Sequence, residues 1–370
     1  MGRWEFAARH HMTASDAESC TVGDLLELEP GAQNRLLGLE LKYVPTWGTD
    51  ELREAVAATY DTLSAADVLA FAGAEEGLFW ALSEALAPGD HAIVTVPNYQ
   101  SMESVSRATG ADVEGLVLRA ENAFAPDPGE LERMLRPSTK VVCLNFPNNP
   151  TGAVPARDVF EDIVRACDRR GVRVFSDEVY RGLELDQAHT LVQAADLSER
   201  AISLNVTSKA YGLPGLRVGW LASRDREFLA RVERRKHYTS ICNAAPSELL
   251  AAIAIRHGET LKSRCRDLVR HNAELATRFF AKWPSLFEWS APQGGCVCFP
   301  RYRGQDGVET FAEALLREQG VLVLPASVYR SELGQVPPDR FRLGIGRRDA
   351  EAGFAAIDRH LRLPRGPAVS

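Results

Sequence analysis

A single lysine is surrounded by residue types that suit chemistry better than solvent exposure. Lys209 lies in the stretch SLNVTSKAYGLPGLRVGW (203–220), which also holds three glycines, a proline and Arg217. One interpretation of this stretch is a flexible surface loop with an exposed lysine. The other is a buried amine, which the nearby apolar side chains favour: Leu213, Leu216, Val218 and Trp220. Burial and a neighbouring cation such as Arg217 both lower the pKa of an amine, so Lys209 would act as a neutral nucleophile or proton carrier.

Polar side chains also follow predicted strands elsewhere in the chain. FSDEVYRG (175–182) sets Asp177 at a strand end, with Tyr180 three residues on. The Asp177 carboxylate either caps the next segment or pairs with a cationic ring nitrogen, an ion pair that is strong in a low-dielectric site. NFPNNPTG (145–152) holds more asparagine and proline than a strand–helix turn needs. That excess favours a positioned amide donor over a plain turn.

Two glycine-containing segments have features of phosphate-binding patterns. AGAEEGLFWAL (72–82) places Gly73 and Ala74 at the start of a predicted helix. The free N–H groups and the dipole there either hold a phosphate or simply begin a helix. GLPGLRVG (212–219) lacks the spacing of a dinucleotide fingerprint, and no acidic residue follows at the right distance. A Rossmann-type dinucleotide site is therefore excluded.

Near-continuous apolar strands alternate with amphipathic helices before residue 260. The predicted strands are HAIVTVP (91–97), KVVCLNFP (140–147), VRVFSDEV (172–179), AISLNV (201–206) and RVGWLAS (217–223). Helical periodicity predicts helices over 75–86 and 156–171. This alternation predicts an α/β fold with a mainly parallel sheet covered on both faces. Because ligands bind at the carboxyl ends of such strands, we expect the polar segments described above to form one site.

After about residue 260 the pattern changes to that of a smaller α+β unit. A long charged helix (263–283) precedes strand-like segments at 294–302, 321–325 and 341–346, and a last helix covers 349–361. The 370 residues exceed the usual size of one hydrophobic core. We therefore predict a large domain over 36–260 and a small domain formed by 1–35 together with 261–370.

Charge, cysteine usage and apolar runs narrow the class of protein. A formal net charge of −7 argues against a general binder of nucleic acid or anionic membranes. Seven cysteines at scattered spacings favour reduced thiols over a disulfide framework. Cys296 and Cys298 share a strand face without a second ligand pair, so core thiols are favoured and no metal is expected. The N-terminus lacks the apolar region of a signal peptide and the run 249–255 is too short to span a bilayer, so a cytoplasmic location is expected.

An ordered set of motifs resembles one enzyme family. GAEE, NNPTG, SDEVY, SKAYGLPGLRVGW and a late FRLG are similar to the class I and II aminotransferases, fold-type I enzymes that use pyridoxal 5′-phosphate (PLP). The resemblance extends from about Tyr43 to the C-terminal helix. It implies a homodimer that exchanges an amino group between an L-amino acid and a 2-oxo acid. In one departure, Val206 stands where the family often has a phosphate-binding hydroxyl, with Thr207 and Ser208 next to it.

The resemblance implies roles for the matching residues toward the cofactor. Lys209 would form the internal Schiff base, and Asp177 would keep the pyridinium nitrogen protonated. Tyr180 and Asn149 would hydrogen-bond the phenolic oxygen of the ring, and Tyr99 would lie over the ring face. The phosphate would be held by Gly73, Ala74, Glu75, Ser208 and Arg217.

Further roles concern the second subunit and the substrate. Tyr43 would reach the cofactor phosphate of the neighbouring subunit. Arg342 would bind the substrate α-carboxylate, a bidentate task that suits a guanidinium, and Asn149 would also contact the substrate.

The N-terminal tract bears on the substrate side chain. SDAESCTVGDL (15–25), with PQGGCVCFPR (292–301), resembles the capreomycidine synthase-like branch of the family, which implies elimination and cyclisation of an arginine-like amino acid. If this tract folds over the site, Asp16 or Glu18 would pair with a guanidinium or ammonium group. Ser15 and Glu18 also fit a capping box at a helix start, which is the favoured interpretation.

Three functions remain open on the sequence. The leading hypothesis is a PLP-dependent aminotransferase. The alternative is a PLP-dependent lyase, cyclase or oxidase that acts on a basic amino acid in specialised metabolism. A PLP-sensing transcription regulator is a distant third, because residues 1–40 offer no basic winged-helix segment.

Overall fold

The computed structural model describes residue 4 and residues 7–363. Its centre is a seven-stranded sheet with the strand order β2-β8-β7-β6-β5-β3-β4. β8 runs antiparallel to both of its neighbours, and the other neighbouring pairs are parallel. The strands are β2 (Val68–Phe71), β3 (His91–Val96), β4 (Asp112–Val117), β5 (Thr139–Asn145), β6 (Arg173–Asp177), β7 (Ile202–Val206) and β8 (Gly219–Ala222). The predicted mainly parallel sheet is confirmed, and each of the five predicted strands is present.

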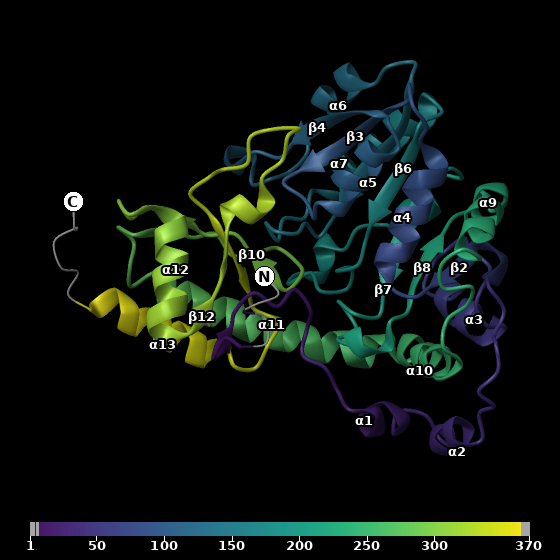
Figure 1. Cartoon of the computed structure of the whole chain (residues 1–370), viewed down its shortest axis with the longest axis horizontal. Helices are drawn as coiled ribbons and strands as arrows, with labels where there is room; N and C mark the ends of the chain where they lie inside the picture. The colour runs from purple at the N-terminus through teal and green to yellow at the C-terminus, as the bar shows by residue number, and fades with distance from the viewer. Residues whose placement is uncertain (1–3, 5–6, 364–370) are drawn as a thin grey trace.

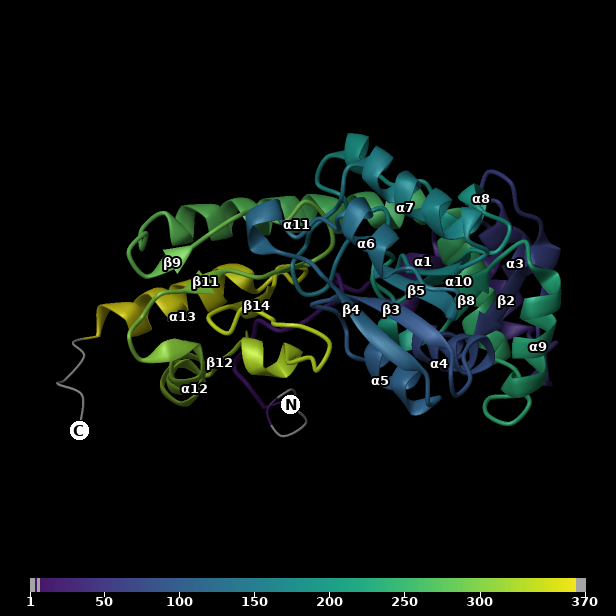
Figure 2. The ribbon, with the colours of Figure 1, turned by 90° about the horizontal axis from the view of Figure 1, so that it is seen from above.

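Helices cover both faces of this sheet, as Figure 2 shows for α4 and α5 on one side and α6 and α7 on the other. On β5, Val141 and Cys143 pack in one apolar cluster with residues of α4 and α9, whereas Val142 and Leu144 pack in another with residues of α6 and α7. Alternate side chains of β5 thus face opposite sides of the sheet, and both sides are covered by helices. This explains why the strand is a continuous apolar run in the sequence. The helices are α3 (Asp50–Ala57), α4 (Ala74–Ala85), α5 (Ser101–Ala108), α6 (Pro128–Met134), α7 (Arg157–Arg169), α8 (Ala194–Leu197), α9 (Arg226–Lys236) and α10 (Ala245–Arg256).

The C-terminal third forms a second unit beside the sheet, reached through the long helix α11 (Figure 1). Its helices are α11 (Gly258–Phe280), α12 (Gly307–Gln319) and α13 (Ala350–Arg362). Its short strands are β9 (Phe287–Glu288), β10 (Val297–Cys298), β11 (Arg301–Tyr302), β12 (Val321–Leu322), β13 (Leu324–Pro325) and β14 (Phe341–Gly344). β1 (His10–His11) pairs with β12 in parallel, so the N-terminal segment lies against this unit. The division into 36–260 and 1–35 plus 261–370 stays a prediction.

Residues 10–18, here called the N-terminal strap, run beside the end of β14 and the chain that follows it. The amide of Gly344 donates to the carbonyl of Met12 at 2.8 Å, and the amide of Glu18 donates to the carbonyl of Gly346 at 2.8 Å. A Cβ at Gly344 would lie 2.2 Å from the Ala14 carbonyl oxygen, and one at Gly346 would lie 2.4 Å from that of Asp16. These two glycines therefore give the strap room to approach.

The capping box predicted at Ser15 and Glu18 is wrong. Residues 15–18 are not helical, because their polar groups are used by the site and by the chain after β14. A capping box does form a few residues later, where Thr21 and Asp24 exchange hydrogen bonds at the start of α1 (Val22–Leu26).

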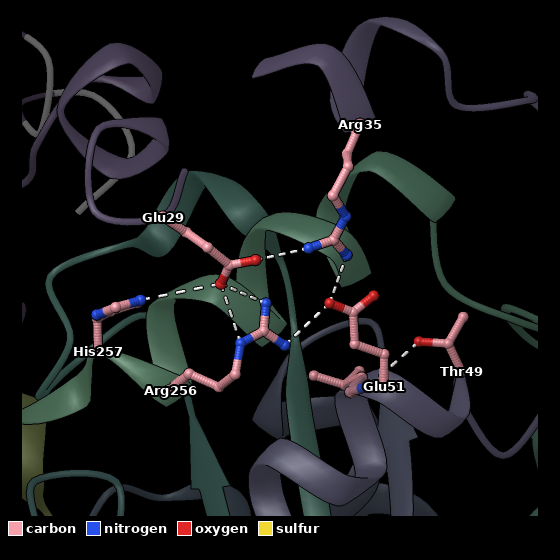
Figure 3. Close-up of polar contacts among 7 residues, drawn as sticks. Glu29, Arg35, Thr49, Glu51, Arg256 and His257 are labelled. Atoms are coloured by element: carbon pink, nitrogen blue, oxygen red, sulfur yellow. Dashed lines mark hydrogen bonds and ion pairs between the residues drawn. The ribbon is translucent and has the colours of Figure 1, made fainter. Parts of the chain in front are cut away.

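The chain from residue 19 to 43, here called the N-terminal arm, contains α1 and α2 (Ala32–Leu37) and lies at the lower edge of the molecule in Figure 1. An ion-pair network holds it to α3 and α10 (Figure 3). Arg35 contacts Glu29 at 2.6 Å and Glu51 at 2.5 Å, and Arg256 contacts the same two carboxylates at 2.6 and 2.9 Å. Within the described part of the chain, no helix is long and apolar enough to cross a membrane.

Candidate active site

A cavity of about 840 Å³ opens at the carboxyl ends of the central strands and is lined on one side by the strap. Side chains that follow β3, β5, β6 and β7 all reach it, as expected for a parallel sheet. The predicted site residues that line it are Asp16, Ala74, Glu75, Tyr99, Asn149, Asp177, Tyr180, Ser208, Lys209, Arg217 and Arg342. Gly73 adjoins them through Arg217. Tyr43 and Glu18 are not among the lining residues.

Lys209 lies three residues beyond the end of β7 and is directed into this cavity. The loop returns on itself, since the amide of Leu213 donates to the carbonyl of Thr207 at 2.9 Å. The Lys209 amine donates to the Ser15 hydroxyl at 2.8 Å and lies 5.9 Å from the centre of the Tyr180 ring. Burial lowers the pKa of Lys209, which increases the fraction of neutral, nucleophilic amine. The exposed-loop interpretation of this lysine is therefore wrong.

Asp177 is the last residue of β6, at the point where the sheet meets the cavity. Its Oδ1 accepts a hydrogen bond from the Val179 amide at 3.2 Å. Burial raises the pKa of Asp177 to about 7, with a smaller contribution from the negative charge of Glu75. A buried carboxylate of this kind is stabilised most by a cation placed against it.

The start of α4 and Arg217 form a cradle for an anion. Gly73 is the N-cap of this twelve-residue helix and has φ +100°, a conformation that glycine adopts without strain. A Cβ at Gly73 would lie only 2.5 Å from Nη2 of Arg217, so the glycine makes room for the guanidinium. Arg217 also donates through Nη1 to the Ser208 hydroxyl at 3.4 Å. Helix N–H groups together with a guanidinium suit a phosphate.

Arg342 on β14 is buried, and it contacts both the loop that carries Asn149 and the strap. Its Nη1 donates to Oδ1 of Asn149 at 3.0 Å, and its Nη2 donates to the carbonyl of Thr13 at 2.6 Å. Its Nε is buried without a hydrogen-bond partner in the described structure. Asn149 is itself oriented by its amide, which donates to Oδ1 of Asn145 at 2.8 Å. The loop that carries it has cis bonds at Phe146–Pro147 and Asn149–Pro150.

The strap and the chain after β14 make contacts that the sequence did not predict. The Tyr180 hydroxyl donates to the carbonyl of Ser15 at 2.8 Å, and Arg347 pairs with Asp16 at 2.7 Å inside the cavity. His11 lines the cavity as well. In the sequence, Arg347 is indicated only by its position five residues after Arg342, and no motif around it marks it as part of a site.

Comparison with known proteins decides the family. Residues 28–355 match the model of the aminotransferase class I and II family. The chain belongs to this family. It is 32% identical over 361 residues to the capreomycidine synthase of Streptomyces vinaceus, covering 96% of this chain and 90% of that protein. Among solved structures it is similar to a PLP-dependent aminotransferase from Streptococcus suis (TM-score 0.91, 27% identity, covering 99% and 96% of the two chains) and to the PLP-dependent cyclase OrfR (TM-score 0.88, 26%, 98% and 96%).

This aminotransferase-family enzyme therefore has PLP-dependent fold type I and uses PLP. The cavity fits that cofactor on its own chemistry. It offers a buried amine at Lys209, a buried carboxylate at Asp177 and a phosphate cradle at Gly73 and Arg217. Of the hydroxyls near Val206, that of Ser208 lies in the cavity, whereas Thr207 Oγ1 donates to the carbonyl of Val218 at 3.1 Å.

Tyr43 lies outside this cavity, and the residue is 84% exposed to solvent. It lines a second, shallower hollow with residues of the N-terminal arm. Its contact with a neighbouring subunit's cofactor stays a prediction. Among the residues that the structure describes, no cluster of three or more histidine, cysteine, aspartate or glutamate side chains could hold a metal ion.

Proposed function

We propose that the enzyme is an amino acid:2-oxo acid aminotransferase whose chemistry is centred on Lys209. The observation that carries this proposal is one cavity that contains a lysine with a lowered pKa, a buried carboxylate and a buried arginine: Lys209, Asp177 and Arg342. Amino-group transfer needs these three elements: a covalent and proton-carrying amine, a partner for the cofactor ring, and an anchor for the α-carboxylate.

The proposed cofactor contacts are those that the family resemblance implies, and the presence of most of these residues around one cavity supports them. Ala74 and Glu75 at the start of α4, with Gly73, Ser208 and Arg217, hold the phosphate. Asp177 pairs with the ring nitrogen, Tyr180 and Asn149 hydrogen-bond the phenolic oxygen, and Tyr99 covers the ring face. When bound, PLP supplies an electron sink that makes the Cα–H bond of an attached amino acid acidic. With the cofactor bound, Lys209 would carry the proton to and from Cα of the substrate.

Substrate binding is proposed to begin at Arg342. Its Nε is buried without a partner, and its terminal nitrogens already contact Asn149 and the Thr13 carbonyl. A substrate α-carboxylate supplies the acceptors that this guanidinium needs. Beyond the α-carbon, Asp16 is proposed to meet a cationic side chain. Glu18, the other carboxylate considered, accepts from the Arg348 amide at 3.1 Å and does not line the cavity, so we give it no contact with the substrate side chain.

A second reaction class is favoured by a specific observation. The chain is 32% identical to a capreomycidine synthase, and it places the Asp16 carboxylate in the cavity, where it suits an arginine-like substrate. A lyase, cyclase or oxidase would use the same cofactor anchors as a transaminase. The residues that hold PLP therefore do not separate the two reactions.

The experiment follows the cofactor and the products together. A panel of L-amino acids is added to the PLP-loaded enzyme, and cofactor and products are identified by mass. Transamination predicts pyridoxamine phosphate and a 2-oxo acid in equal amounts. If the enzyme turns over and regenerates PLP without an amino acceptor, the assignment would change from aminotransferase to lyase, cyclase or oxidase. The Lys209→Ala variant should lose either activity, and retained turnover would refute the assignment.

We also propose a homodimer with shared sites. Tyr43 is 84% exposed, and other large apolar side chains nearby in the chain or on the loop after α9 are exposed too: Leu37, Leu41, Tyr238 and Ile241. Light scattering should give twice the chain mass, and Tyr43→Phe should weaken PLP binding if this hydroxyl reaches the partner's phosphate. A monomer that binds PLP normally would contradict this. A reducing compartment such as the cytoplasm fits the seven free cysteines.

A further inference from the structure

One ion pair in the cavity is left unused by the proposed cofactor and α-carboxylate contacts. Arg347 and Asp16 both line the cavity, and their charged atoms are 2.7 Å apart. Arg347 lies on the same stretch of chain as Arg342, five residues further on. Arg342 is assigned to the substrate α-carboxylate, so the same cavity offers a second guanidinium, that of Arg347, to the remainder of a bound amino acid.

The strap is held so that Asp16 keeps this place. Gly344 and Gly346 admit the strap at Ala14 and Asp16, where a Cβ would collide with the strap backbone. Ser15 contacts Lys209 on one side of Asp16, and the Glu18 amide is bonded to the carbonyl of Gly346 on the other. Asp16 is also close enough to Lys209 for its charge to oppose the lowering of the lysine pKa by burial. The carboxylate therefore lies within reach of a group bound at the reactive amine.

The two members of the pair differ in burial. The Asp16 side chain is 16% exposed, whereas that of Arg347 is 33% exposed. A largely buried carboxylate needs a counter-ion, because an unpaired charge out of water is strongly destabilising. A half-exposed arginine has a long flexible stem and can turn its guanidinium to water at small cost. When the pair opens, Arg347 is the partner that leaves.

We propose that Arg347 occupies the place of a substrate cation: Asp16 attracts amino acids with a terminal guanidinium or ammonium group, and Arg347 competes with them for this carboxylate. A basic side chain displaces Arg347 and takes over its ion pair with Asp16, and one cation is exchanged for another. A neutral side chain leaves the pair closed, and an anionic side chain is repelled by Asp16. This inference rests on the proposed amino-group chemistry and names the substrate class of that site. Arg347 thereby becomes an internal competitor that lowers the affinity for basic substrates.

The test measures binding by equilibrium dialysis on the PLP-loaded enzyme, with L-arginine and the uncharged, similarly long L-norleucine as probes. Arg347→Met removes the competitor, so the affinity for arginine relative to norleucine should rise about tenfold. Asp16→Asn removes the attraction, so the ratio should fall by about tenfold or more. The double variant leaves no unpaired charge to disturb folding, and it should resemble Asp16→Asn. Arg348→Met is the matched control, since this exposed neighbour lies outside the cavity and its loss should leave the ratio unchanged.

Two results would overturn the inference. A fall of the arginine-to-norleucine ratio in Arg347→Met would mean that Arg347 helps to hold the substrate. An unchanged ratio in both single variants would mean that other residues recognise the side chain. Failure of the proposed function is seen separately, as a cofactor that neither amino acid converts. The dialysis ratios still decide the role of the pair in that case.

Discussion

The phosphate cradle leads to a prediction about PLP binding that can be distinguished from a general loss of folding stability. Gly73 has φ +100° and ψ 166°, a backbone region that is almost restricted to glycine. In a Gly73→Ala variant this conformation costs about 1–3 kcal/mol of folding free energy. The new Cβ would also lie 2.5 Å from Nη2 of Arg217. Because that atom is the far end of a flexible side chain, Arg217 rather than the helix is expected to move.

The size of the effect on cofactor binding follows from the contact that is lost. A hydrogen bond between charged groups contributes about 1.5–3 kcal/mol. Displacing Arg217 from the phosphate should therefore raise the Kd for PLP about 10- to 150-fold. The matched control is Gly89→Ala. Gly89 has φ +91° but nothing within 4 Å of its would-be Cβ, so it tests a positive-φ penalty without the clash.

The assay has two parts. Urea unfolding of the PLP-free proteins should show both variants destabilised, whereas titration of PLP by its visible absorbance should show weaker binding in Gly73→Ala alone. A Kd for PLP that is unchanged in Gly73→Ala would refute the placement of Arg217 against the phosphate. An equal loss of PLP affinity in both would show that the effect is general rather than local.

Three further predictions concern stability. Burial raises the pKa of Asp177 to about 7, so its protonated carboxyl stabilises the PLP-free protein fully below about pH 4, and this stability is lost as the pH rises through about 7. The urea midpoint should therefore decline between about pH 5 and 8, and Asp177→Asn should flatten this decline. An unchanged slope in the variant would contradict the prediction. Arg256→Met removes two ion pairs of the N-terminal arm and should speed proteolysis within residues 19–43 about two- to tenfold, a difference that 1 M NaCl should abolish. Lys236 is fully buried and donates to two backbone carbonyls, so Lys236→Met should cost about 2–5 kcal/mol in urea unfolding, whereas the exposed Lys42→Met should cost less than about 0.5 kcal/mol.

The sheet and the residues at its strand ends were predictable because their signals are local. Each central strand is an apolar run with polar punctuation, and the connectivity rules place the carboxyl ends of the parallel strands at one edge. Asp177 is the last residue of one of these strands, and Lys209 lies three residues beyond the end of another. Their convergence therefore needed no knowledge of distant contacts.

The strap was not predictable, because its contacts join positions far apart in the chain. Arg347 meets Asp16 across 331 residues, and Ser15 meets Lys209 across 194. The Thr13 and Ser15 contacts to Arg342 and Tyr180 use backbone carbonyls, which carry no sequence signal. The same distance effect explains the incorrect capping box: the Glu18 carboxylate accepts from the backbone of a residue 330 positions away rather than from its own turn.

The central claim is that Lys209 is the residue that holds the cofactor. The most direct test is to reduce the PLP-loaded enzyme with borohydride, digest it and locate the pyridoxyl group by peptide mass mapping. We predict a single modified site at Lys209, absent from the Lys209→Ala variant. A pyridoxyl group on another lysine, such as the buried Lys236, or a loaded enzyme without any modified lysine, would contradict the account.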